Sequence, residues 1–217
     1  SSFFSIPIIL DLLDALRYLQ VRPNPVVHNN LSPGTIFFDY SEHKEKPILT
    51  GFENARTLSQ TENAIPFMNL ALFFAAPEVM NGIYIPQSDI YSLGAVLYYM
   101  MTGIPPFYDE TVVNQPIDKQ KKLLEQIRNR RLDFSLADSD LIDDHLKNTI
   151  IKVLSFNFRD RFQTPEEFGR ALNKEVMLDH FDNPSPRQSF QPAQNNKGGG
   201  GFKQIAGMDE IKLQLKE

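Results

Sequence analysis

The 217-residue chain contains no cysteine and only four histidines, which are widely scattered along the sequence. The absence of cysteine excludes a disulfide framework and any thiolate metal site, so a metal ion would need histidine or carboxylate ligands. Histidines this scattered do not favour a zinc site. We therefore expect no metal centre in this chain.

The chain also lacks an excess of positive charge and any long apolar run. Its formal net charge of −5 carries no electrostatic signature of nucleic-acid binding. The basic segment Lys119–Arg131 favours a solvated amphipathic helix, with Leu123, Leu124 and Ile127 facing inward, over a nucleic-acid contact. The most apolar stretch, Ile90–Met101, is shorter than the about 20 residues that cross a bilayer. We expect neither a nucleic-acid nor a membrane partner.

Targeting signals are missing as well. The first 20 residues have no basic n-region and no cleavage site, and Asp11 and Asp14 interrupt their apolar periodicity, which is typical of an amphipathic helix and not of a signal peptide. Together with the cysteine-free composition, this indicates a cytoplasmic protein. Because the sequence enters a helix almost at once, we expect the natural polypeptide to extend upstream.

Periodicity predicts a mainly α-helical unit with one small β-hairpin. Apolar residues from Ile8 to Leu19 follow helical spacing, and two prolines end that segment. Residues 36–39 and 47–50 are short strand candidates separated by a polar loop, which favours a hairpin. Residues 51–75 show no sustained period, and an irregular segment of this length is usually functional or mobile.

Four further helices are predicted in the second half of the unit, at 89–102, 119–131, 140–154 and from Thr164 onward. Thr164 and Glu167 are expected to form a capping box around Pro165 at the first helical position. The composition then changes at about Asp182 to proline, glutamine, asparagine and glycine, which predicts a flexible linker over 181–201. Residues 202–217 regain apolar periodicity, so we expect a second domain to continue beyond them.

Five landmarks, taken in order, resemble the C-terminal lobe of a eukaryotic-type protein kinase. "HNNLSPGT" begins at His28 where the family has H-R-D-L-x-x-x-N, and "GFE" at 51–53 stands in place of D-F-G. "APE" ends at Glu78, "SDIYSLGAVLYYMMTGIPPF" resembles the family's central helix, and Arg161 matches the arginine that pairs with that glutamate. The resemblance implies a protein-kinase-like C-lobe over residues 1–180, in which Asp89 braces the backbone of the catalytic loop.

The same resemblance implies that the chemistry is lost. Asn30 stands where the family has its catalytic aspartate, and an amide has no basic site near neutral pH. The two magnesium ligands fall on Gly51, which has no side chain, and Thr35, whose lone hydroxyl is a poor ligand for a hard cation. The degenerate positions are His28, Asn30, Ser32, Thr35, Gly51, Phe52 and Glu53.

Two further positions would remove the regulatory switch. Asn29 replaces the arginine that commonly pairs with a phosphorylated activation loop, and Ala71 replaces a threonine of that segment. By contrast, the residues with bracing roles, Glu78, Asp89 and Arg161, are all present. His28 is then best interpreted as a packed, hydrogen-bonded histidine and not as an acid or base.

The family's N-terminal-lobe motifs are absent from this chain, so half of an ATP site is missing from it. Near the other end, "FKQIAGMDEIKLQLKE" resembles the opening of an AAA-type ATPase domain, through Phe202, Ile205, Gly207, Met208 and Lys212. The alternative is an ordinary amphipathic helix after a linker. If the resemblance holds, the nucleotide-binding motifs of that ATPase lie downstream.

Three functional hypotheses follow. The first is a pseudokinase C-lobe that acts as a binding or regulatory module tethered to a downstream ATPase, with no cofactor of its own. Its partner would be another protein or the downstream ATPase, and the contact surface would be Lys119–Arg131 or the segment 51–75; the phenylalanines of 67–74 favour core packing over docking. The second is a divergent kinase that binds ATP and magnesium, with Glu53 replacing the lost aspartate. The third places all activity in the downstream ATPase, for which the lobe recognises substrates.

Overall fold

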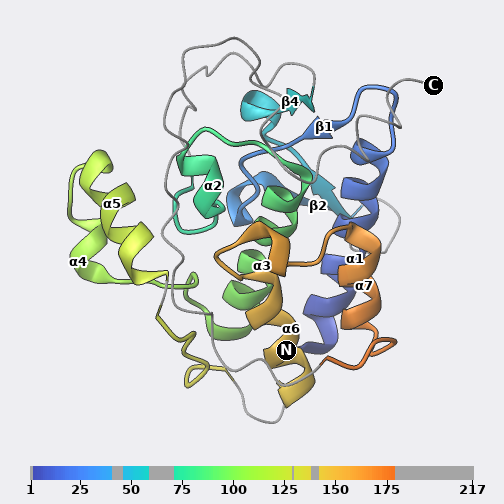
Figure 1. Cartoon of the computed structure of the whole chain (residues 1–217). Coiled ribbons are helices and arrows are strands. Elements are labelled where there is room, and N and C mark those ends of the chain that lie inside the picture. Colours follow the sequence, from blue (N-terminus) through green and yellow to red (C-terminus); the bar gives the residue numbers. More distant parts are fainter. Residues whose placement is uncertain (1, 41–45, 59–70, 129, 138–141, 179–217) are drawn as a thin grey trace. The chain divides into compact units, whose positions relative to one another are not determined.

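A computed structural model describes residues 2–40, 46–58, 71–128, 130–137 and 142–178 (Figure 1). The predicted linker at 181–201 and the ATPase-like segment at 202–217 lie outside the described residues, as does the stretch 59–70 of the irregular segment. Within the described ranges, no helix combines the length and apolarity that a membrane crossing requires.

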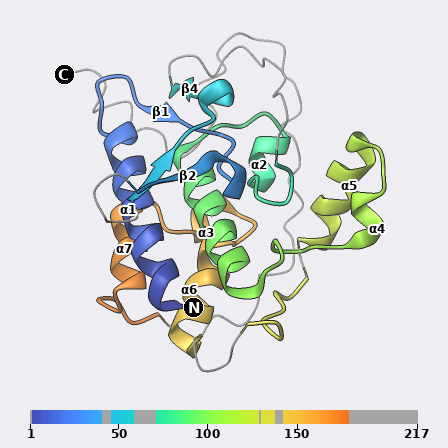
Figure 2. The ribbon, with the colours of Figure 1, turned by 180° about the vertical axis from the view of Figure 1, so that it is seen from behind.

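Four helices build the main core: α1 (Ser2–Gln20), α3 (Pro86–Thr102), α6 (Asp144–Val153) and α7 (Pro165–Leu172). The central helix α3 packs against α1 and α6, and α7 packs against both of those helices (Figures 1 and 2). Ile90, Leu93 and Leu97 of α3 are fully buried. A Cβ on Gly94 would lie 2.3 Å from Cγ1 of Val153, so glycine allows α3 and α6 to approach closely. The prediction of a mainly α-helical unit is confirmed.

Helix boundaries follow local capping chemistry. Helix α3 ends at the predicted residue, where Gly103 adopts a left-handed conformation, but it begins three residues early because Pro86 fits the first helical turn. Helix α6 begins later than the predicted 140, because the Asp143 carboxylate accepts the Leu146 N–H at 2.8 Å and so caps the helix there.

The capping box predicted for α7 forms only in part. The Thr164 hydroxyl accepts the backbone N–H of Glu167 at 3.2 Å, as expected. The Glu167 carboxylate, however, accepts the N–H of Gln163 at 2.7 Å and not that of Thr164. The donor of the reciprocal bond is therefore the residue before the one that the motif predicts.

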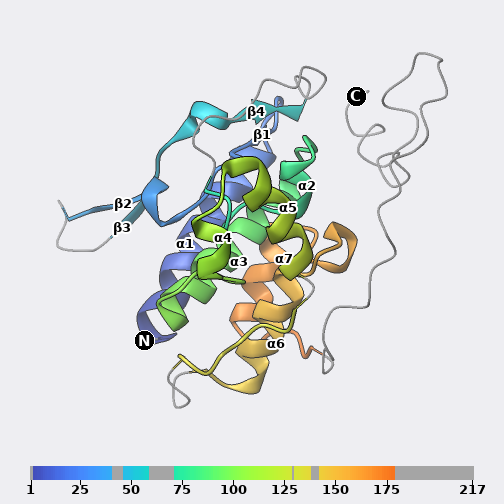
Figure 3. The ribbon, with the colours of Figure 1, turned by 90° about the vertical axis from the view of Figure 1, so that its left-hand side faces the viewer.

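Two small antiparallel sheets flank the helices. Strands β2 (Ile36–Asp39) and β3 (Lys46–Leu49) pair with Ile36 opposite Leu49, which confirms the predicted hairpin with β3 displaced by one residue. β3 contacts α1, and from there the hairpin projects outward (Figure 3). Strands β1 (Val26–Val27) and β4 (Arg56–Thr57) form a second pair, which was not predicted because two-residue strands carry no alternating pattern. Short 3₁₀ turns at Pro33–Thr35 and Phe52–Asn54 follow β1 and precede β4.

A smaller cluster joins α2 (Pro77–Met80), α4 (Glu110–Val113) and α5 (Ile117–Ile127). Leu124 and Ile127 of α5 are buried and Leu123 is partly buried, which confirms the inward face predicted for this helix, although α5 ends at Ile127 and not at Arg131. Phe73 packs on this cluster and Phe74 on the main core. The described part of the 67–74 stretch therefore lies in the core, and 67–70 lies outside the described residues.

Candidate functional site

The loop from His28 to Thr35 is held by one carboxylate from the central helix. Asp89, which is fully buried in α3, accepts the backbone N–H of His28 at 2.7 Å and that of Asn29 at 2.9 Å. Burial raises the pKa of Asp89 to about 7, although the two N–H donors oppose that rise. The loop backbone is thus fixed relative to the core of the unit.

Asn29 adopts a left-handed conformation with φ 65°, which asparagine tolerates better than most residues. Its side-chain amide donates to the carbonyl oxygens of Val27 at 3.3 Å and Asn54 at 3.2 Å. The residue that stands in place of the family's arginine therefore links the loop to the 3₁₀ turn at Phe52–Asn54.

His28 uses both ring nitrogens within the fold. Its Nε2 lies 2.8 Å from the Thr50 carbonyl oxygen, and its Nδ1 lies 3.3 Å from the backbone nitrogen of Asn30. A neutral ring protonated on Nε2 satisfies both bonds, and burial lowers the pKa of His28. The ring also packs against Phe52, with 4.7 Å between centroids. These contacts describe a structural histidine.

Asn30 contacts the far end of the irregular segment. Its Oδ1 accepts the backbone N–H of Ala71 at 3.1 Å. A carboxamide oxygen can accept this hydrogen bond but cannot take up a proton near neutral pH. At the position that the resemblance aligns with the family's catalytic base, the chain therefore carries a group that binds its own backbone.

The Thr35 hydroxyl also serves the loop itself. Its Oγ1 lies 3.0 Å from the Ser32 carbonyl oxygen and 3.3 Å from that of Asn30, and it accepts the Ser32 N–H at 3.1 Å. These contacts close the turn Pro33–Thr35. Ser32, which directly precedes this turn, is buried.

Gly51, which the family resemblance aligns with a magnesium ligand, lies directly against Thr35. The Thr50 N–H donates to the Thr35 carbonyl oxygen at 2.9 Å, and Gly51 adopts φ +76°. A Cβ on Gly51 would lie 2.6 Å from Cγ2 of Thr35 and 3.5 Å from Oε2 of Glu53. The threonine methyl therefore occupies the space that an aspartate at position 51 would need, and one carboxylate oxygen of Glu53 lies beside it. In the described part of the chain, no three His, Asp or Glu side chains are grouped closely enough to hold a metal ion.

A buried ion pair ties the end of the irregular segment to the C-terminal part of the unit. Arg161 binds Glu78 through two bonds, Nη1 to Oε1 at 2.7 Å and Nη2 to Oε2 at 2.8 Å, and the Ser88 hydroxyl donates to Oε1 at 2.8 Å. Burial alone would raise the pKa of Glu78, but the charge and hydrogen bonds of Arg161 hold it below its usual value. The pairing expected from the family resemblance is therefore present.

Arg128 is a buried charged residue to which the sequence reasoning gave no role. It follows α5 and donates from Nη2 to the carbonyl oxygens of Leu72 at 2.7 Å and Ala75 at 2.6 Å. Its place four residues after the buried Leu124 puts it on the inward face of the helix, and that spacing was a usable signal.

Comparison with known proteins identifies the family. A model of the protein kinase domain matches residues 6–173. This chain belongs to the protein kinase family. Its relatives include the calcium-dependent protein kinase SK5 of Glycine max, 27% identical over 187 residues that make up 86% of this chain and 33% of that protein. Calcium-dependent protein kinase 11 of Arabidopsis thaliana is 26% identical over 86% of this chain and 34% of its own length.

A third relative, calcium-dependent protein kinase 7 of Oryza sativa subsp. japonica, is 32% identical over 94 residues, 43% of this chain and 16% of that protein. The chain spans about a third of the length of the first two relatives. Its mostly helical content with two small sheets agrees with a protein-kinase-like fold.

Proposed function

We propose that this kinase-family unit is a pseudokinase C-lobe that serves as a binding or regulatory module and does not transfer phosphate. The observation that carries the proposal is the packing of Thr35 on Gly51. A methyl group lies 2.6 Å from the site of a missing Cβ and fills the space that an aspartate side chain at position 51 would need, so the loss of the ligand is accompanied by repacking around it.

The catalytic-base position supports the same proposal. Asn30 has no basic atom that could take the proton of a substrate hydroxyl. A general-base contribution of about 10²–10⁴ in rate is therefore lost. Its amide oxygen instead binds the Ala71 N–H. The bracing contacts of Asp89 and of the Glu78–Arg161 pair are present. They hold the loop and α2 in place, as a binding surface requires.

The test is a phosphate-transfer assay on the natural full-length protein with radiolabelled ATP and magnesium. We expect no incorporation above the background of an Asn30→Ala variant. Transfer that disappears in Asn30→Ala would overturn the proposal, because it would make Asn30 part of a working site. Asn173→Ala, on the exposed surface after α7, is a matched control for the loss of an asparagine amide.

A second candidate, a divergent kinase that binds ATP without the usual ligands, is favoured by the position of Glu53. Its Oε2 lies 3.5 Å from where a Cβ of residue 51 would be, close to the place of the absent aspartate. Carboxylate oxygens are the ligands that magnesium prefers, so Glu53 could contribute one bond to a metal–nucleotide complex. The relatives named above are calcium-dependent protein kinases, which also supports this candidate.

Thermal denaturation of the full-length protein with ATP, with and without magnesium, separates the two candidates. The divergent-kinase candidate requires a magnesium-dependent rise in Tm that Glu53→Gln abolishes. Glu110→Gln, an exposed residue at the start of α4, is the control. No rise with ATP and magnesium supports the pseudokinase proposal.

The tether to a downstream AAA-type ATPase, the C-lobe boundary at 180 and the cytoplasmic location remain proposals that rest on sequence alone. A partner protein, or that ATPase, is the binding target we propose. If residues 202–217 open an ATPase domain, the full-length protein should hydrolyse ATP even when Asn30 is replaced. An ATPase assay of the Asn30→Ala variant tests this arrangement.

A further inference from the structure

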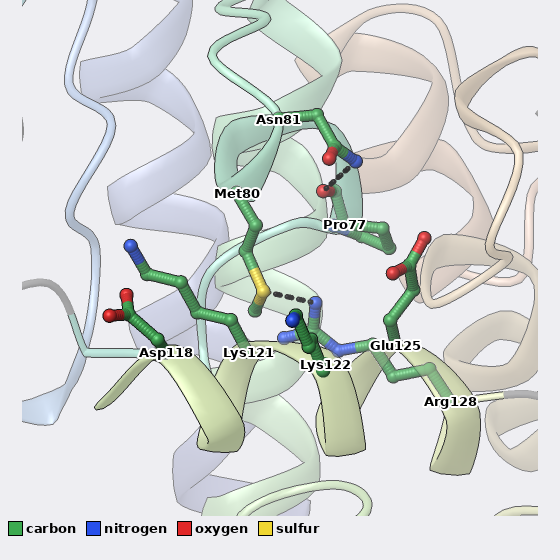
Figure 4. Close-up of a pocket in the computed structure, with 8 residues that line it drawn as sticks. All are labelled: Pro77, Met80, Asn81, Asp118, Lys121, Lys122, Glu125 and Arg128. Carbon is green, nitrogen blue, oxygen red and sulfur yellow. Dashed lines mark hydrogen bonds between the residues drawn. The ribbon is translucent and has the colours of Figure 1, made fainter. Parts of the chain in front are cut away.

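Two features of the described surface lie outside the site above: a cavity between α2 and α5, and the outer edges of the β2–β3 hairpin. The cavity has a volume of about 500 Å³, and side chains of both charge signs line it (Figure 4). Arg128, which is one of them, already donates to Met80 and to the backbone of residues 72 and 75. The cavity therefore does not single out a ligand, whereas the hairpin carries a specific pattern of backbone donors and acceptors.

The hairpin is a sheet of only two strands, so each strand has one edge without a neighbouring strand among the described residues. β3 is the strand that lies against α1, and the hairpin projects outward from there (Figure 3). Large apolar side chains are exposed on it, with 61% of Phe37, 65% of Tyr40 and 43% of Ile48 accessible. A two-stranded hairpin is marginally stable in water, and an open apolar edge is a template for a further strand.

The ladder of the hairpin determines which backbone groups point outward. The Thr50 N–H donates to the Thr35 carbonyl oxygen at 2.9 Å, so these two residues form a hydrogen-bonded pair at the base of the ladder. Such pairs alternate in an antiparallel ladder, so Phe37 and Ile48 form the next one. The outward-pointing N–H and C=O groups belong to the residues between, which are Ile36, Phe38, Pro47 and Leu49.

The two edges differ in what they offer to another strand. On β3, Pro47 has no N–H to donate, and proline at an edge opposes strand addition. On β2, Phe38 offers both its N–H and its carbonyl oxygen, and Ile36 offers its carbonyl oxygen because its N–H is bound to Pro33. The same alternation places the N–H of Tyr40 on this edge. The edge of β2, and not that of β3, can therefore accept a strand.

We propose that a second copy of this chain pairs with the edge of β2, with the two β2 strands antiparallel and Phe38 opposite Phe38. Each Phe38 N–H then meets the carbonyl oxygen of the other Phe38, and each Tyr40 N–H meets the carbonyl oxygen of the other Ile36. The Ile36 N–H, which is bound to Pro33, would only have added a bond at each end of the paired segment. The edge is thus complementary to itself under a two-fold rotation, which favours a second copy over an unrelated strand.

The side chains agree with this register. Ile36, Phe38 and Tyr40 share one face of β2, so the two Phe38 rings become cross-strand neighbours and each exposed Tyr40 packs beside the other Ile36. Each Asp39 lies opposite Phe37 of the second copy, so the two carboxylates do not face each other. Because the hairpin projects outward, antiparallel pairing places the helices of the two copies at opposite ends of the new sheet (Figure 3).

This inference goes beyond the proposed function, because it concerns the assembly of the chain and holds whether or not phosphate is transferred. The contact is small, so we expect a weak and reversible dimer. Since the β3 edge lacks a donor at Pro47, association should stop at two copies and not continue into a fibre.

Sedimentation velocity of the 217-residue chain at rising concentration tests the dimer. Tyr40→Pro removes the donor N–H and should weaken the dimer at least about tenfold relative to Tyr40→Ala, which loses the same ring but keeps the N–H. Position 40 follows the last residue of β2 and is exposed, so neither substitution removes a core contact. The inference is wrong if the chain stays monomeric, if it grows beyond a dimer, or if the two variants dimerise equally well.

Cysteine cross-linking reads the register, since the chain has no cysteine of its own. In the proposed pair the two Cα atoms of residue 38 lie about 5.5 Å apart, within the about 4.4–6.8 Å that a disulfide spans. Phe38→Cys should therefore give a cross-linked dimer on mild oxidation. In Tyr40→Cys the two thiols lie roughly 13 Å apart along the strands, so no cross-link should form although this position is the more exposed. Equal cross-linking of both variants would mean that the copies do not pair in this register.

Hydrogen exchange followed by nuclear magnetic resonance distinguishes a second copy from another occupant of the edge. The amides of Phe38 and Tyr40 should exchange more slowly as the concentration of the chain rises. The amide of Phe37, which lies inside the hairpin ladder, should not change and is the internal control. Protection of Phe38 and Tyr40 that does not depend on concentration would place another segment of the same chain on the edge and would overturn the inference.

Discussion

Arg161 and Glu78 are joined by two parallel hydrogen bonds of 2.7 and 2.8 Å, although 83 positions separate them in the sequence. The pair is almost completely buried, with side-chain exposures of 0% and 4%. Arg161 also donates to the carbonyl oxygens of Ser155 and Phe156. The guanidinium therefore ties the segment before α7 to helix α2, which carries Glu78.

Replacing Arg161 by methionine should lower the free energy of unfolding by about 3–5 kcal/mol, because it leaves the Glu78 carboxylate buried without its counter-charge. Urea denaturation followed by circular dichroism measures this change. Arg17→Met is the matched control: Arg17 lies 3.7 Å from Glu166, both side chains are about half exposed, and the cost should be below about 1 kcal/mol. Equal losses in the two variants would mean that the buried pair contributes no more than a surface pair.

The second prediction concerns pH and Asp89. Its pKa is raised to about 7 in the folded chain, so the folded state binds this proton more tightly than the unfolded state does. The contribution of Asp89 to stability is therefore complete at about pH 4 and is lost as pH rises through 7, by on the order of 4 kcal/mol. In Asp89→Asn this dependence disappears, while stability is lower throughout because an amide cannot accept both N–H groups.

Urea denaturation at several pH values between 4 and 8 measures the difference between the parent chain and Asp89→Asn. The lowered pKa of His28 acts in the opposite direction, since its stabilisation is lost as pH falls, but it is common to both proteins and cancels in the difference. Asp11→Asn, on the exposed face of α1, is the control for removal of one negative charge. A difference that stays constant with pH would show that Asp89 remains ionised throughout.

Local patterns predicted those parts of the fold that depend on neighbouring residues. Helix α7 is specified by Thr164 and Pro165, and the β2–β3 hairpin by two apolar runs on either side of a short polar loop. Order along the chain, from His28 to Arg161, was enough to identify the loop and its braces. Each of these features is encoded within a window or a motif.

Contacts between distant segments could not be predicted in the same way. The β1–β4 pair joins two dipeptides that carry no periodicity of their own. The contact of the Thr35 methyl with Gly51 depends on how two turns pack against each other. The spacing of residues in the sequence does not predict such a contact. The same holds for the hydrogen bond from the Ala71 N–H to Asn30 and for the burial of the Arg128 side chain.

The third prediction concerns the bond between Asn30 and Ala71. Asn30→Ala removes the acceptor of the Ala71 N–H, and loss of a hydrogen bond worth about 1.4 kcal/mol would speed exchange of that amide about tenfold. Asn30→Asp keeps an acceptor at the same place and should leave the rate nearly unchanged. Native-state hydrogen exchange by nuclear magnetic resonance measures both variants. The Thr50 amide, which donates to Thr35, is the internal control. If Ala71 exchanges alike in both variants, Asn30 does not protect it.

The fourth prediction tests whether Thr35 closes the position of the lost metal ligand. Gly51→Ala should be destabilised by two effects: about 1–2 kcal/mol for placing alanine at a positive φ, and about 1–3 kcal/mol for forcing its Cβ against Cγ2 of Thr35. Gly103→Ala isolates the first effect, because Gly103 has φ +77° and nothing within 4 Å of the added Cβ.

Thr35→Ser removes the obstructing methyl and keeps the hydroxyl that closes the loop, so it isolates the second effect. In that background the cost of Gly51→Ala should fall toward the cost of Gly103→Ala, leaving only a residual contact with the Cβ of residue 35 at 3.2 Å. Urea denaturation of the two single variants and the double variant gives a coupling free energy of about 0.5–3 kcal/mol. A coupling near zero would show that Thr35 yields freely, and an aspartate at position 51 would then need no second change to fit.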